Sequence, residues 1–195
     1  DFIMGMDASC VPALEAGGVK YYSADGTETD VFQILSQHGI NYIRVRVWND
    51  PYDENGNGYG GGNNDIDKAV EIGKRATKYG MKLLVDIQYS DFWADPAKQT
   101  RPKYWQSHDH EKLKTEIYRY TTWVLETITE GGGDIGMVQV GNETTNGFCG
   151  EVDKENIYKA EEMLRPDDFY VTKNRVIYEN LLAMRDAGID FDLVT

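Results

Sequence analysis

Cysteine and histidine are scarce in this chain of 195 residues, which has two of the first and three of the second. Neither Cys10 nor Cys149 shows the spacing of a metal site or has a histidine base beside it. The histidines likewise show no ligand spacing: His38, His108 and His110. The sequence therefore predicts no metal site, and we assign the histidines no chemistry.

Basic residues are also few, with 20 Lys and Arg against 33 Asp and Glu, and the net charge is -13. Nucleic acids and anionic membranes need clustered positive charge, so neither is expected as a partner. A neutral ligand fits the composition better. Acidity has a plainer explanation in solubility, so the charge alone does not identify a ligand.

Long apolar runs are missing, since none approaches the roughly 18 residues of a membrane span. The first residues lack the charged and apolar regions of a signal peptide. A mature secreted protein has the same appearance. We therefore expect no membrane partner, and an extracellular location remains compatible with the sequence.

Strand-like and helix-like segments alternate through the first three quarters of the chain. Four expected strands occupy residues 2–6, 42–48, 81–87 and 135–140. Helices are expected to begin at the caps Asp30 and Asp65 and to cover residues 113–128, and glycines such as Gly39 and Gly80 are placed to end them. This alternation predicts a parallel sheet of the α/β class.

The last third of the chain is less regular. Helices are expected at residues 156–164 and 175–187, a doubtful strand at 169–172 and an incipient strand at 191–195. A full (β/α)8 barrel takes about 250 residues. We therefore predict one domain over residues 1–195, an incomplete TIM barrel holding about the first six strands.

Polar side chains cluster where the expected strands end. They are Asp7-Ala8-Ser9, Arg46-Val47-Trp48, the segment from Asp86 to Trp93, and Gly141-Asn142-Glu143. A closed barrel gathers the carboxyl ends of its strands on one rim, so these groups should lie together. Cys10 and Cys149 would follow the first and fourth strands, far apart on that rim, which makes a disulfide the less favoured state.

The segment Gly141-Asn142-Glu143 offers the most specific chemistry. An amide followed by a carboxyl group at a strand end can place a hydroxyl-binding side chain beside a proton donor. Cleavage of a glycosidic bond requires that combination.

The strand ends resemble those of the glycoside hydrolase family 53 endo-β-1,4-galactanases. The resemblance lies in residues 5–9, 42–51, 85–99 and 138–143 and extends to about Gly150. Its specific part is the string Tyr89-Ser90-Asp91-Phe92-Trp93-Ala94-Asp95-Pro96 together with Gly141-Asn142-Glu143. The resemblance implies a monomeric, extracellular endo-hydrolase of β-1,4-galactan in pectic arabinogalactan. No cofactor is required, and calcium stays undecided because the family's calcium loops lie outside this chain.

The resemblance also implies roles for individual residues. Glu143 is the acid/base, Asn142 binds the sugar 2-hydroxyl, and Arg46 lies beneath the nucleophile and keeps it ionised. Aromatic rings are expected to line the sugar cleft: Trp48, Tyr89 and Trp93. Other polar groups are expected to hold the hydrogen-bond network: Asp7, Asp86, Ser90 and Asp91.

Simpler explanations stay open for several of these residues. Arg46 and Asp86 can form a structural ion pair, and Glu143 can cap the following helix. Trp48 and Trp93 can belong to the core, although a ligand-facing position is favoured because they precede polar loops. Two further tryptophans are expected to be packing residues: Trp105 and Trp123.

The chain departs from the family pattern in two respects. Gln88 stands where the family usually has histidine, and an amide cannot carry charge. The family's nucleophile glutamate of the seventh strand has no counterpart in these 195 residues, either because they are part of a longer polypeptide, which we favour, or because the protein is a truncated homologue. The alternatives in function are an inactive galactan-binding partial barrel and another clan glycosidase such as a β-mannanase or cellulase.

Overall fold

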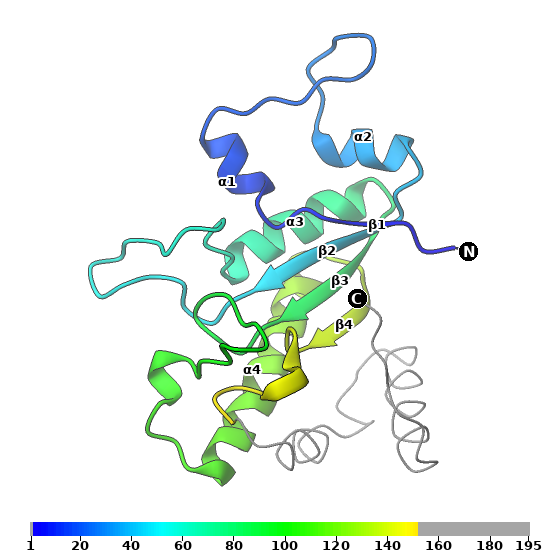
Figure 1. Cartoon of the computed structure of the whole chain (residues 1–195). Coiled ribbons are helices and arrows are strands. Elements are labelled where there is room, and N and C mark those ends of the chain that lie inside the picture. Colours follow the sequence, from blue (N-terminus) through cyan, green and yellow to red (C-terminus); the bar gives the residue numbers. More distant parts are fainter. Residues whose placement is uncertain (1, 152–195) are drawn as a thin grey trace.

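The computed structural model describes residues 2–151 (Figure 1). Its centre is a parallel sheet with the order β1-β2-β3-β4. The strands are β1 (Gly5–Asp7), β2 (Tyr42–Val47), β3 (Lys82–Ile87) and β4 (Ile135–Val140). The α/β class and these four strands are confirmed, although β1 begins three residues later than predicted. The segments predicted at 156–164, 169–172, 175–187 and 191–195 lie outside the described residues.

The strand register aligns the polar residues across the sheet. Asp7 is paired with Arg44, Arg46 with Asp86, and Asp86 with Gln139. An irregularity between Leu83 and Leu84 shifts the β3–β4 register by one residue. Since the strands are parallel, their carboxyl ends meet at one edge, as the sequence predicted.

Within residues 2–151 the sheet is accompanied by four α-helices: α1 (Val11–Ala16), α2 (Val31–Gln37), α3 (Ile66–Lys78) and α4 (His110–Glu130). Two short 3-10 helices follow strand ends: η1 (Lys103–Trp105) and η2 (Thr144–Asn146). Asp30 and Asp65 cap their helices as predicted, accepting from the amides of Phe32 and Lys68, each at 3.0 Å. Helix α1 was not predicted, because six residues are too few to show helical periodicity.

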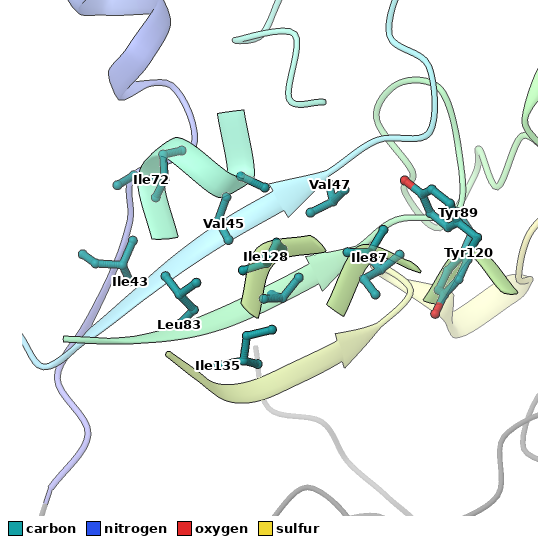
Figure 2. Close-up of a cluster of buried hydrophobic side chains, with 14 of the residues drawn as sticks. Ile43, Val45, Val47, Ile72, Leu83, Ile87, Tyr89, Tyr120, Ile128 and Ile135 are labelled. Carbon is teal, nitrogen blue, oxygen red and sulfur yellow. The ribbon is translucent and has the colours of Figure 1, made fainter. Parts of the chain in front are cut away.

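The core lies between the sheet and helices α3 and α4 (Figure 2). One face of β2 and β3 supplies six side chains that are at most 1% exposed: Ile43, Val45, Val47, Leu83, Val85 and Ile87. Gly73 lets α3 approach closely, since a Cβ there would lie 2.9 Å from Leu83 Cδ1. Each fully buried side chain contributes about 1.5–3 kcal/mol to folding.

Arg75 of α3 connects this helix to α1 and α2. Its guanidinium lies 2.6 Å from a carboxylate oxygen of Glu15, which belongs to α1, and 3.0 Å from Asp30, the cap of α2. The aromatic ring of Phe32 lies beneath it, 4.6 Å away. No helix among residues 2–151 is both long and apolar enough to cross a membrane.

Candidate active site

The polar strand ends come together around Arg44, which extends from β2. Its Nη1 donates to Asp7 of β1 at 2.7 Å, and its Nη2 donates to Asp86 of β3 at 2.6 Å. Nη2 also donates to Asn142 Oδ1 at 3.0 Å, and Nε donates to Gln139 of β4 at 3.3 Å. One guanidinium therefore connects all four strands at the rim.

The sequence analysis assigned no role to Arg44. The signal was present, because period-two alternation places Arg44 and Arg46 on the same face of β2. Asp7 lies opposite Arg44 in the register, yet the arginine nearer the strand end was selected instead. Gln139 was missed for the same reason, since it precedes the conspicuous Asn142 and Glu143.

Asp86 has no exposed side-chain area, and its ion-pair partner is Arg44. The alternative of a structural ion pair between Arg46 and Asp86 is therefore wrong, because the ion-pair partner of Asp86 is Arg44. Burial raises the pKa of Asp86 to about 6, although Arg44 and a hydrogen bond from Gln88 Nε2 at 3.0 Å act in the opposite direction. Its Oδ1 has no hydrogen-bond partner among the described residues.

Asp7 behaves differently because it is only partly buried. Burial by itself raises the pKa of Asp7. Hydrogen bonds from Ser9 and Arg44 and the charge of Arg46 outweigh it, so the net shift is downward. The Ser9 amide donates to Asp7 Oδ1 at 3.0 Å. Asp7 therefore stays ionised to a lower pH than Asp86 does.

Arg46 is buried beside the cluster. Its Nη2 lies 3.2 Å from Cys10 Sγ and 3.8 Å from Asp7 Oδ1, and the guanidinium carbon lies 4.2 Å from the Trp93 ring centroid. Within residues 2–151, its Nε has no hydrogen-bond partner. Its role beneath a nucleophile stays a prediction. Cys10 and Cys149 both carry free thiols.

Two of the three predicted cleft-lining rings are buried. Trp48 has no exposed area, and its Nε1 donates to Gln88 Oε1 at 2.9 Å. Tyr89 is equally buried and shares a 2.8 Å hydrogen bond with the Thr121 hydroxyl of α4. The structure contradicts a cleft-lining position for both. Tyr89 has a φ of 51°, and this left-handed backbone turns its ring back into the core (Figure 2).

The other tryptophans divide between the core and the surface. Trp93 is 36% exposed, with its ring at 5.4 Å from that of Trp48, so it can present a face to a ligand. Trp105 is buried, which confirms the packing prediction. Trp123 is 46% exposed on α4, with its ring 5.7 Å from that of Tyr120, so its packing role stays a prediction.

Ser90 and Asp91 organise the loops above the site. The Ser90 hydroxyl donates to the Phe92 carbonyl, and Asp91 accepts from the backbone amides of Asp50 at 3.1 Å and Lys103 at 2.8 Å. Burial raises the pKa of Asp91. Lys103 in turn binds Asp50 at 2.8 Å. These contacts join the loop after β2 to the loop after β3.

Asn142 is held in a fixed orientation. Its Oδ1 accepts from Arg44 and from Gln139 Nε2, the latter at 3.1 Å, and its Nδ2 donates to the Ala94 carbonyl at 2.7 Å. An amide has two N–H donors, so the second one has no partner among the described residues. That donor is the group available to a ligand hydroxyl.

Glu143 is exposed and follows Asn142 at the end of β4. Its φ of 50° and ψ of 48° place it in the left-handed region, which costs a non-glycine residue about 1 kcal/mol. Its side chain makes no capping hydrogen bond to η2, so the capping alternative finds no support. Within residues 2–151, a carboxyl group without an ion-pair or hydrogen-bond partner thus lies beside an oriented amide.

The described residues contain no group of three or more His, Cys, Asp or Glu side chains that could hold a metal ion. The rim carries carboxyl, amide and guanidinium groups. Such groups transfer protons and bind hydroxyls. A parallel α/β sheet with helices on its outer face and this rim at its carboxyl edge is typical of glycoside hydrolases with TIM barrels.

The sequence model of glycosyl hydrolase family 53 matches residues 3–194. The chain belongs to this family, as the motifs predicted. It is 60% identical over 153 residues to an endo-β-1,4-galactanase of Bacillus subtilis (strain 168), covering 78% of this chain and 36% of that relative. With an arabinogalactan endo-β-1,4-galactanase of Humicola insolens it shares 36% identity over 152 residues, covering 78% of this chain and 43% of that one.

Solved structures show the same barrel. The family 53 catalytic domain of Ignisphaera aggregans aligns with a TM-score of 0.78 at 34% identity, over 98% of this chain and 58% of that domain. A structure from a study of two fungal β-1,4-galactanases aligns with a TM-score of 0.73 at 32% identity, over 88% of this chain and 49% of that one. The chain thus spans part of a TIM barrel and less than two thirds of these relatives.

Proposed function

We propose that this chain carries the acid/base half of a retaining endo-β-1,4-galactanase site. The observation that supports it is the exposed Glu143 carboxyl, which has no partner among the described residues and follows the oriented amide of Asn142 after β4. The substrate class follows from the names of the relatives, which are galactanases. The net charge of -13 suits a neutral polysaccharide.

In this proposal Glu143 protonates the leaving glycosidic oxygen and later removes a proton from the attacking water. The free N–H of Asn142 donates to the sugar 2-hydroxyl, a bond that strengthens as the transition state gains positive charge. Retention requires a second carboxyl about 5 Å from the first. We place that nucleophile outside the described residues, with Arg46 beneath it.

The Arg44 cluster supports this chemistry indirectly. Arg44 and Gln139 both donate to Asn142 Oδ1, which directs the Nδ2 end toward Ala94 and the ligand. Trp93 offers the exposed ring on which a pyranose face can pack. An extracellular location, a monomeric state and the absence of a required cofactor remain part of the proposal.

The test is hydrolysis of β-1,4-galactan by the complete polypeptide that contains these 195 residues and by its Glu143→Gln variant, with Glu111→Gln on α4 as a matched control. Loss of the general acid should lower kcat by about 10²–10⁴-fold, while the control keeps full activity. Full activity of Glu143→Gln would refute the acid/base assignment.

Two further arms separate the alternatives. If the complete unaltered polypeptide binds galacto-oligosaccharides in calorimetry without releasing products from galactan, it is an inactive binding protein. If it releases products faster from β-mannan or cellulose than from galactan, the substrate class is wrong. Reducing-end assays on the three polysaccharides give the second answer directly.

A further inference from the structure

The loop of residues 93–99, between β3 and η1, holds the segment Asn142–Glu143 at three places. The Ala94 carbonyl accepts from Asn142 Nδ2 at 2.7 Å. Gln99 Nε2 donates to the Asn142 carbonyl at 2.7 Å and to the Glu143 carbonyl at 3.3 Å. One loop thus binds both the side chain of Asn142 and the backbone on either side of the Asn142–Glu143 peptide bond.

Gln88 anchors this loop to β3. Its Oε1 accepts from the Ala94 amide at 3.1 Å and from Trp48 Nε1 at 2.9 Å, and its Nε2 donates to Asp86 Oδ2 at 3.0 Å. Asp86 binds Arg44, Arg44 binds Asn142, and Asn142 binds Ala94. These hydrogen bonds form a closed ring through Gln88, Ala94, Asn142, Arg44 and Asp86. In this ring Gln88 connects the Asp86 carboxyl to the loop.

The chemistry of the two glutamines suits these positions. One oxygen with two lone pairs can accept the two converging N–H groups at Gln88, while the other end of the same amide donates to a carboxylate. At Gln99 the donor end faces three carbonyl oxygens, since Nε2 also lies 3.1 Å from the Asp95 carbonyl. A flipped amide would set oxygen against oxygen there. Both side chains are more than nine-tenths buried, where a neutral donor avoids the cost of a buried charge.

The backbone of Glu143 needs such support. Its left-handed conformation is one that non-glycine residues rarely adopt without surrounding contacts. The side chain is exposed and makes no capping bond, so the place of its carboxyl depends on the backbone. Gln99 is the side chain that binds the carbonyl of this residue.

We propose that Gln88 and Gln99 are positioning residues that hold Asn142 and Glu143 in the geometry of proton transfer. Gln99 fixes the backbone of the acid/base directly, and Gln88 fixes the loop from which Gln99 extends. The inference rests on the proposed function of Glu143. Under this proposal the reaction also depends on two neutral amide side chains. Neither of them touches the substrate.

The experiment replaces each amide by methionine, which keeps the length of the side chain but removes its hydrogen bonds. The variants are Gln99→Met and Gln88→Met, and the control is Gln106→Met, which removes an exposed amide that donates to the Arg101 carbonyl. We measure kcat and KM on β-1,4-galactan and amide hydrogen exchange across residues 141–145. Misplacement of a catalytic group by about 1 Å can lower the rate by about 10²-fold. In both test variants kcat should therefore fall by roughly 10–100-fold, while KM stays within about twofold of its original value.

Hydrogen exchange provides a result that does not depend on activity. In both test variants the amides of residues 141–145 should exchange at least tenfold faster, while those of β2 and β3 stay unchanged, and Gln106→Met should alter neither. All variants are made in the complete polypeptide that contains these residues. If the unaltered polypeptide fails to hydrolyse galactan, the proposed function is lost, and hydrogen exchange alone decides the inference.

Unchanged exchange across residues 141–145 overturns the positioning role. So does an unchanged kcat in an active protein, or equal acceleration of exchange through the whole sheet, because the last result describes a general loss of stability.

Discussion

The two faces of the sheet are made from the same strands but are held together by different forces. The outer face of β2 and β3 is apolar and packs on α3 and α4, with side chains at most 1% exposed. The inner face carries Arg44, Arg46 and Asp86 at alternating positions on the same strands. Apolar burial stabilises without direction, whereas charges in a buried setting lose hydration and regain energy only with good partners. The outer face therefore stabilises the fold, and the inner face orients the site.

Adjacent leucines of β3 test this comparison most strongly. Leu83 is fully buried on the outer face, while Leu84 is only partly buried on the inner one. Leu83→Ala should lower the free energy of unfolding by about 2–5 kcal/mol, because the cavity beside Gly73 and Gly133 cannot close. Leu84→Ala should cost clearly less. Urea unfolding of both variants measures the difference, and equal losses would contradict it.

Removal of the guanidinium tests the inner face. Arg44→Met leaves the buried Asp86 without its ion-pair partner and should lower the free energy of unfolding by about 2–3 kcal/mol. The loss is smaller than for a fully buried pair because the Arg44 side chain is 28% exposed. In an Asp86→Asn background the same change should cost less, and the difference gives the coupling energy. Arg119→Met, at an exposed pair on α4, serves as the control and should change stability by less than about 0.5 kcal/mol. Additive effects of Arg44→Met and Asp86→Asn would show that the pair contributes nothing.

The pH dependence of stability gives the smallest expected effect. Asp86 has a folded pKa of about 6 against an ordinary value of 3.8, so the folded state holds a proton that the unfolded state has lost between these values. Its contribution to stability therefore falls as pH rises from about 4 to about 6. Asp7, whose pKa is lowered, acts in the opposite sense, losing its contribution as pH falls below 3.8.

Asp86→Asn removes this dependence. The stability difference between the variant and the unaltered chain should shift by about 1–3 kcal/mol in favour of the variant as pH rises from 4 to 7. Urea unfolding at several pH values measures it. A difference that stays constant over this range would show that the pKa of Asp86 is not raised.

The sequence predicted the fold well where local chemistry decides it. Asp30 and Asp65 cap helices because a carboxylate at that point satisfies free backbone amides, whatever lies around it. The strands followed from period-two alternation and continuous apolar runs. Helix α1 was missed because its six residues begin with a valine and a proline and show no repeated apolar spacing.

The site was predicted less completely, because side-chain direction depends on tertiary contacts. Alternation placed Arg44 and Arg46 on one face, but register and reach decide that Arg44 binds Asp86. No sequence signal marks the left-handed backbone that turns Tyr89 into the core. Trp48 lies at a polar loop, as predicted, yet Phe92 and Trp93 cover its ring.

The left-handed backbone of Glu143 has a consequence for laboratory evolution. Glycine adopts this conformation without strain, so Glu143→Gly relieves a local cost that the native chain tolerates. Selection for heat resistance alone should therefore enrich glycine at this position, whereas selection for growth on galactan should eliminate it under the acid/base role that we propose for Glu143. A library screened in both ways would expose this single position as a site where stability and activity make opposite demands.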